Sequence, residues 1–167
     1  MAIIFRFRML TDENDNFVRD YEVQSDMTLT QFHEFIAETL EYEEAMVSFH
    51  TADGRWEKIE EFTMMDMGDD GPRLMDSVRL DEIMTHIGDR LVYNFDMMQN
   101  RAYYLELMVA ERANEEFSYP RELFAHGTAP DQYDPDLSVN DGSIFDEMMD
   151  GFNDFEGDES ADDEYYY

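Results

Sequence analysis

The sequence contains no cysteine, and this absence removes several classes of protein at once. Disulfide scaffolds, thiolate zinc sites, iron–sulfur clusters and cysteine nucleophiles all need that side chain. Long apolar runs are missing too, since none approaches the roughly 20 residues that cross a bilayer as a helix. Residues 1–8 interleave apolar and basic side chains, unlike the continuous apolar stretch of a signal peptide. We therefore expect a cytoplasmic protein with no membrane partner.

Positive charge is also scarce. Lys and Arg number 11 against 42 Asp and Glu, which gives a formal net charge of −31, and Lys58 is the single lysine. A protein with this field repels polyphosphates, and no P-loop motif is present to hold one. We expect no kinase or NTPase activity and no direct binding of nucleic acid.

The charge divides the chain into two parts. Residues 127–167 carry 14 acidic and no basic side chains, and glycine and proline recur there. Proline and glycine interrupt regular structure, whereas the apolar 43% of the chain shows that a core forms elsewhere. We predict a folded domain over residues 1–134 and an acidic, largely flexible tail over residues 135–167.

Apolar residues in the first part alternate with polar ones, as expected for strands with one buried face. Residues 3–9 and 17–23 flank a turn-rich segment and predict a hairpin. Further strands are predicted at residues 46–50, 56–62, 91–95 and 103–109.

Two helices are expected between these strands. Thr28 and Gln31 have the spacing of a capping box, and apolar residues then recur at helical intervals as far as Leu40. A short second helix should begin at Leu80 and stop at Gly88. The predicted fold is α+β, a mainly antiparallel sheet of about six strands with two helices packed on it.

Four stretches, taken in order, resemble the plasmid pRiA4b ORF-3-like family over about residues 3–134. They are Phe17 to Val23, Thr28 to Ile36, Gly88 to Asp96 with the preceding Val78 to Leu80, and Tyr119 to Arg121 with Gly127 and Pro130. The resemblance implies an α+β domain of unestablished activity that is sometimes encoded near mobile elements.

The chain departs from the family pattern at two places. Where the family has Asp-Phe-Gly-Asp followed by Trp, this sequence reads Asn94 to Met98 and has no Trp there. Where family members often carry cysteines, Glu122, Ala129 and Asp134 stand instead. A metal role at those positions is therefore not carried over.

Motifs of catalysis are missing from the rest of the sequence. His33-Glu34 lacks the second histidine of H-E-x-x-H, because position 37 is alanine, so we predict that His33 is partly buried and bonded to a neighbour. The other histidines, His50, His86 and His126, fall on separate elements. We assign no catalytic, cofactor-binding or metal-binding residue.

The tail contains one patterned segment at residues 143–152. Ser143 and Asp146 have capping-box spacing, and the apolar residues that follow share one helical face. We predict a short amphipathic helix whose partner-binding residues are Ile144, Phe145, Met148, Met149 and Phe152. The alternative, that this segment packs on its own domain, stays open.

Three functions are compatible with these features. The first is a non-enzymatic protein-binding module whose acidic tail contacts a partner with a basic or apolar groove. The second is an acidic mimic of nucleic acid that occupies the basic cleft of a DNA-binding protein. The third is a divalent-metal-dependent enzyme built from scattered carboxylates and histidines.

Overall fold

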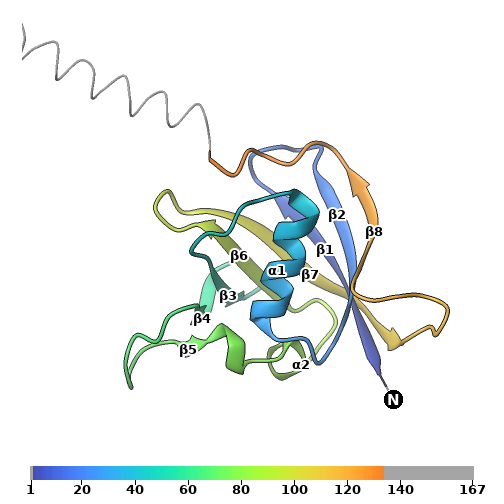
Figure 1. Cartoon of the computed structure of the whole chain (residues 1–167), viewed down its shortest axis with the longest axis horizontal. Helices are drawn as coiled ribbons and strands as arrows, with labels where there is room; N and C mark the ends of the chain where they lie inside the picture. Colours follow the sequence, from blue (N-terminus) through green and yellow to red (C-terminus); the bar gives the residue numbers. More distant parts are fainter. Residues whose placement is uncertain (1, 134–167) are drawn as a thin grey trace, which may run out of the picture. The chain divides into compact units, whose positions relative to one another are not determined.

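The computed structural model describes residues 2–133, which form an eight-stranded sheet with one long helix lying across one face (Figure 1). Its strands are β1 (Ile3–Thr11), β2 (Val18–Gln24), β3 (Ser48–Ala52), β4 (Lys58–Thr63), β5 (Arg73–Leu74), β6 (Arg90–Asp96), β7 (Arg101–Arg112) and β8 (Arg121–His126). The helices are α1 (Leu29–Leu40) and α2 (Leu80–Ile83), with a 3₁₀ turn, η1, at Met75–Ser77. The predicted α+β class is confirmed.

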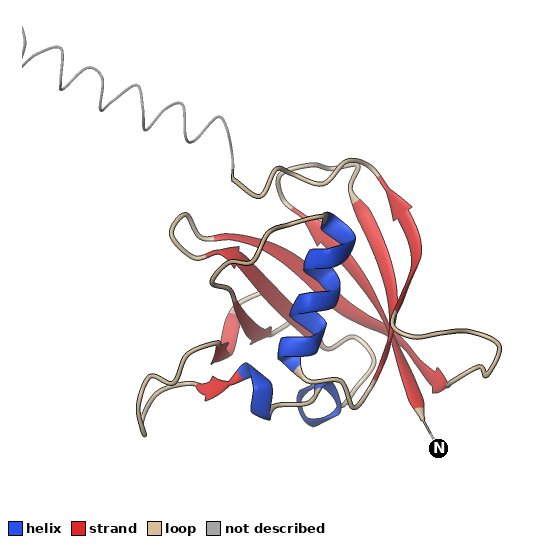
Figure 2. Ribbon diagram, viewed as in Figure 1, coloured by secondary structure: helices blue, strands red, loops and turns tan. Residues whose placement is uncertain are grey.

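The sheet has the order β5-β4-β3-β6-β7-β1-β2-β8. Three hairpins supply its centre, because β1 pairs with β2, β3 with β4 and β6 with β7, all antiparallel. The longest pairing joins β1 to β7, which places the first strand in the middle of the sheet rather than at an edge. The short β5, parallel to β4, is the exception to the antiparallel pattern (Figure 2).

The sequence predicted about six strands, fewer than the eight in the structure, because β5 and β8 were not anticipated. β5 has only two residues, and β8 is exposed along nearly its whole length. Neither strand has the alternating burial that makes a strand visible in a sequence. The second helix is also shorter than predicted: it ends at Ile83, and Ile87 is 60% exposed.

Helix α1 begins at a capping box. The Thr28 hydroxyl accepts from the Gln31 amide at 3.1 Å, and the Gln31 side chain accepts from the Thr28 amide at 3.0 Å. Two of the amides that a helix N-terminus leaves unpaired are thereby satisfied. This cap, predicted from spacing alone, sets where α1 starts to cover the sheet.

The core between α1 and the sheet is rich in aromatic rings. The ring centroid of Phe32 in α1 lies 5.2 Å from that of Phe7 in β1. Phe32 also stacks on Phe49 of β3, which in turn stacks on Tyr93 of β6 with 4.9 Å between the ring centroids. These four rings are at most 1% exposed. Burying one such ring contributes about 2 kcal/mol, so this row is a main source of stability.

The last described residues are fastened to the sheet by a buried arginine. Arg101, at the start of β7, is 6% exposed and binds the Glu13 carboxylate through two hydrogen bonds of 2.9 Å. Its guanidinium also donates to the backbone carbonyls of Asp131 and Gln132 at 2.8 Å. The Gln132 side chain exchanges two further bonds with the backbone of Glu43. The chain is therefore held firmly up to residue 132, and the predicted boundary at residue 134 stays a prediction.

Candidate functional site

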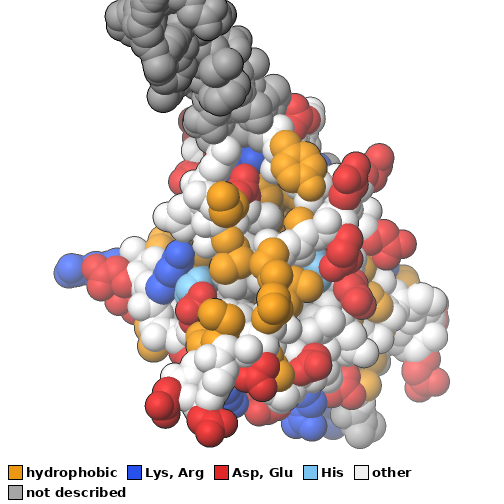
Figure 3. All heavy atoms as spheres, turned by 60° about the vertical axis from the view of Figure 1, so that its left-hand side comes forward, with side chains coloured by type: hydrophobic (Ala, Val, Ile, Leu, Met, Phe, Trp, Pro, Cys, Tyr) orange, Lys and Arg blue, Asp and Glu red, His pale blue; other side chains and the backbone are white. Residues whose placement is uncertain are grey.

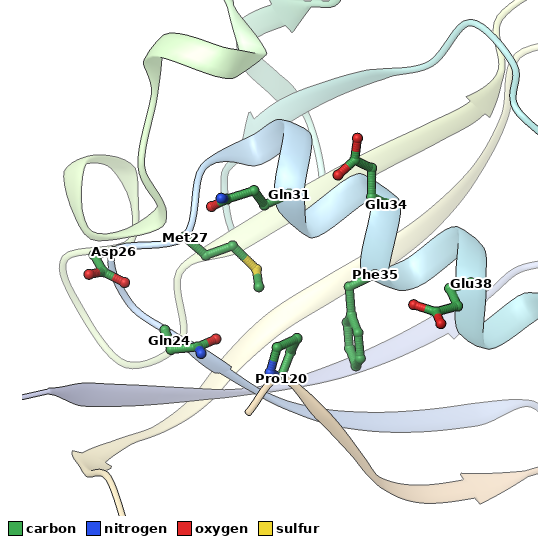
Figure 4. Close-up of a pocket in the computed structure, with 8 residues that line it drawn as sticks. All are labelled: Gln24, Asp26, Met27, Gln31, Glu34, Phe35, Glu38 and Pro120. Atoms are coloured by element: carbon green, nitrogen blue, oxygen red, sulfur yellow. The ribbon is translucent and has the colours of Figure 1, made fainter. Parts of the chain in front are cut away.

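A groove runs between α1 and the chain that leads into β8 (Figure 4). It has a volume of about 560 Å³. Side chains from the end of β2, the turn before α1, α1 itself and the start of β8 meet there. The lining residues are Gln24, Asp26, Met27, Gln31, Glu34, Phe35, Glu38 and Pro120.

Three apolar side chains form the floor of the groove. Phe35 points from α1 toward Pro120, and Met27 lies beside them (Figure 4). The Phe35 ring also packs edge-to-face on the buried Tyr21 at 5.1 Å, which ties the floor to the core. Floor residues of this kind can hold the aliphatic part of a bound side chain.

The rim of the groove is acidic. Glu34 and Glu38 lie one turn apart on α1, and Asp26 lies at the other end of the groove. No Lys or Arg is among the lining residues. A partner segment that carries ammonium or guanidinium groups would therefore meet carboxylates at both ends of the groove and no competing cation among the lining residues.

Gln24 adds a neutral acceptor to this rim. Its amide nitrogen donates to the Tyr119 carbonyl at 2.9 Å, which holds the side chain in place. Its carbonyl oxygen Oε1 is buried and has no hydrogen-bond partner among the described residues. An unpaired buried acceptor is costly, so a donor from a bound molecule would be stabilising there.

The residues of the groove were not singled out from the sequence. Glu34, Phe35 and Glu38 have i, i+1 and i+4 spacing on a predicted helix, which is readable, but their significance depends on Pro120 lying opposite. That placement follows from the pairing of β8 with β2, and β8 was not predicted.

His33 takes the position that its pattern predicted, although its burial is greater. It is 2% exposed, and Nδ1 lies 2.7 Å from the hydroxyl of Tyr93. Nε2 has no hydrogen-bond partner among residues 2–133, and the Glu44 carboxylate at 3.9 Å is too distant to provide one. Burial lowers the pKa of His33, while the nearby Glu44 acts in the opposite direction. The side chain is a structural contact between α1 and β6.

The remaining histidines do not join His33. His50 lies on β3, His86 follows α2, and His126 ends β8. Within residues 2–133, no three or more His, Asp or Glu side chains are grouped so that they could hold a metal ion. None of the helices in that range is long and apolar enough to cross a membrane.

Exposed methionines gather at one end of the central strands. Met46 precedes β3, Met65 follows β4, and Met97 and Met98 follow β6. Because β3 pairs antiparallel with both β4 and β6, the start of β3 and the ends of β4 and β6 lie at the same end of the sheet. Met98 is 95% exposed. Figure 3 shows a band of hydrophobic side chains with acidic side chains beside it on one face of the molecule. Flexible methionine side chains suit surfaces that contact other proteins.

The predicted partner-binding residues of the tail lie outside the described residues. Ile144, Phe145, Met148, Met149 and Phe152 stay a prediction from the sequence alone.

Comparison with known proteins gives a family and a fold. The model of the plasmid pRiA4b ORF-3-like protein family matches residues 4–160, further toward the C-terminus than the resemblance noted above. No curated protein matches the chain. The crystal structure of MM3350, a protein of unknown function from Methanosarcina mazei Go1, is similar with a TM-score of 0.66 and 15% identity, covering 92% of this chain and 83% of that one. At this identity the likeness concerns the fold alone. Since the family model spans most of the sequence, the chain belongs to the plasmid pRiA4b ORF-3-like family.

Proposed function

We propose that this protein is a non-enzymatic protein-binding module whose partner presents basic and apolar side chains. The observation that carries the proposal is the groove beside α1, which combines an apolar floor with a rim of three carboxylates. Its dimensions suit one or two side chains of a protein segment, and its charge selects Lys or Arg.

The mode of binding follows from the shape of the groove. The aliphatic stem of a partner Lys or Arg lies on Phe35 and Met27, while its charged head is placed between Glu34 and Glu38. Gln24 Oε1, toward the Asp26 end of the groove, accepts a hydrogen bond from a second donor of the partner segment. The net charge of −31 adds a long-range attraction that speeds encounter with a basic partner.

The tail is part of this proposal. Its aromatic and methionine side chains at positions 145, 148, 149 and 152 would act as apolar anchors, and its carboxylates would contact basic groups around the partner's groove. Ordering such a segment on a partner couples folding to binding.

The groove can be tested with a synthetic peptide of alternating lysine and leucine and the full chain. Replacing both rim glutamates, Glu34→Gln and Glu38→Gln, should weaken binding about tenfold in calorimetry, because two charge-assisted contacts are lost. The matched control is Asp69→Asn with Asp70→Asn, which removes the same charge from the exposed loop between β4 and β5.

Comparing the two variants shows whether the peptide binds in the groove or is attracted only by the net charge of the protein. Equal weakening by both would mean that the net charge alone attracts the peptide, and the groove would lose its proposed role. Unchanged binding by the Glu34 and Glu38 variant would have the same consequence.

A further inference from the structure

The only tryptophan of the protein, Trp56, lies on the sheet face opposite α1, in the connection between β3 and β4. Its ring packs against Ala52, Val92 and Ala102. Val92 lies between Leu91 and Tyr93, which both face the core beneath α1, so Val92 and Trp56 belong to the other side of the sheet. This small cluster is separate from the groove described above.

The backbone holds Trp56 in an unusual conformation. Its φ is 66°, in the left-handed region that bulky residues rarely adopt. Asp53 fixes the turn, because its carboxylate accepts from the amides of Arg55 and Glu57 at 2.8 and 3.0 Å. Side chains held in this way outside the common backbone regions concentrate at binding sites.

The Trp56 ring is also held by its neighbours. The Arg90 guanidinium carbon lies 4.5 Å from the centroid of the Trp56 ring, and the guanidinium donates to the Gly54 carbonyl at 2.7 Å. Tyr104 meets the ring edge-to-face at 5.3 Å. Beside these rings, Leu10 is 41% exposed and helps line a shallow pocket of about 370 Å³. Thr11 and Asp12 line it as well, and the Tyr104 hydroxyl donates to the Asp12 carboxylate at 3.5 Å, so the pocket itself takes an uncharged side chain.

Two cations next to Trp56 have no carboxylate partner in the part of the chain that the structure describes. Within residues 2–133, Arg55 and Lys58 form no ion pair within 4.0 Å, although the protein has 42 acidic residues. Lys58 pairs with Ala52 in the sheet, which places it on the same face as the Trp56 cluster. Arg112 is the one other arginine in that range without an ion pair, and it lies at the far end of β7.

We propose that this Trp56 patch, formed by Leu10, Arg55, Trp56, Lys58, Arg90 and Tyr104, binds an acidic segment of a partner protein. An apolar side chain of the segment fills the pocket between Leu10, Trp56 and Tyr104. Carboxylates on either side of it pair with Arg55 and Lys58. Rigid Trp, Tyr and Arg side chains are the residue types that dominate binding energy at protein interfaces.

The charge of the whole protein favours a peptide over a nucleic acid here. A nucleic acid strand brings one negative charge per nucleotide along its length, and all of these meet a molecule of net charge −31. A protein segment with two or three carboxylates is repelled much less, and the cations of the patch act within the Debye length of about 8 Å. The Asp12 carboxylate, which lines the pocket beside the ring, would also repel a phosphate placed there.

Since Trp56 is the single tryptophan, its fluorescence reports directly on the patch. The full chain is titrated with a short synthetic peptide of glutamate, leucine and phenylalanine, followed by Trp56 emission and its quenching by acrylamide. We expect a saturable blue shift and reduced quenching. The double variant Arg55→Gln with Lys58→Gln should bind about fivefold more weakly, as expected for two exposed ion pairs. Leu10→Ser should weaken binding further, with the blue shift measured from the emission of the free variant.

Arg112→Gln is the matched control, because it removes an equally unpaired arginine away from the patch and should bind like the natural sequence. The proposal is overturned if the peptide leaves Trp56 emission unchanged, or if Arg112→Gln weakens binding as much as the double variant. It is also overturned if a thymidine oligonucleotide binds more tightly than the peptide, which would assign the patch to single strands. Emission that depends on the concentration of the protein alone would assign the patch to a second copy instead.

Discussion

For His33, the sequence predicts that the side chain is buried, but not how completely it is buried or which residue it bonds to. The sequence predicted that His33 is partly buried and bonded to a neighbour, but the side chain is only 2% exposed, with the Tyr93 hydroxyl as its hydrogen-bond partner. The sequence could not reveal that partner, because Tyr93 is 60 residues away and reaches α1 only through the pairing of β6 in the sheet.

The burial of His33 predicts a dependence of stability on pH. Its pKa in the folded protein is below 6.5, so as the pH falls below about 6.5 the unfolded chain binds a proton there that the folded protein does not. The stability that the neutral, buried His33 contributes is fully present above about pH 6.5 and is lost as the pH falls toward the pKa of the folded state.

The measurement is the free energy of unfolding in urea at about pH 7.5 and pH 5.5. The decrease on acidification should be smaller for His33→Gln than for the natural sequence. An NMR titration of the His33 ring gives the independent check, and a midpoint at or above 6.5 would contradict the expectation.

Among the elements, those whose apolar residues recur at strand or helix spacing were predictable, and those at the sheet edges were not. The apolar residues of β1 and β2 placed both strands to within a residue or two, although Asp20 and Glu22 on the polar side of β2 are buried as well. Helix α1 was placed by its cap and apolar spacing. β8 was not predicted because its side chains are almost all exposed, and the groove between α1 and the start of β8 could not be predicted without that strand. The order of the strands is set by contacts distant in sequence, such as that of β1 with β7, which no local pattern encodes.

The cap of α1 gives a prediction at this scale. Thr28→Ala removes the side-chain acceptor for the Gln31 amide and should lower the free energy of unfolding by about 1 kcal/mol. Thr28→Ser keeps the hydroxyl and should restore most of the loss in the same urea titration. A cost for Thr28→Ser equal to that for Thr28→Ala would show that the methyl group, not the cap, is responsible.

At the scale of the whole molecule, like charges dominate the surface. Eight of the eleven basic residues are ion-paired within residues 2–133, yet the chain retains a net charge of −31. Self-repulsion of this size opposes the compact state and is reduced by added ions.

We therefore expect the melting temperature to rise by several degrees when sodium chloride is raised to about 0.5 M, where the Debye length is roughly 4 Å. Potassium chloride should act equally, because screening does not depend on the identity of the cation. A gain seen with one cation alone would indicate a specific ion site instead of screening.

The fastening of residues 131 and 132 to Arg101 also determines how the domain responds to mechanical load. A force applied to the chain just beyond residue 132 acts first on the Arg101 hydrogen bonds and on the pair between Gln132 and Glu43. The ladder between β8 and β2 lies behind these bonds, so it is protected from being peeled strand by strand until they break. The guanidinium is anchored in turn by Glu13, in the turn after β1, so the load passes to the strand at the centre of the sheet rather than to its exposed edge.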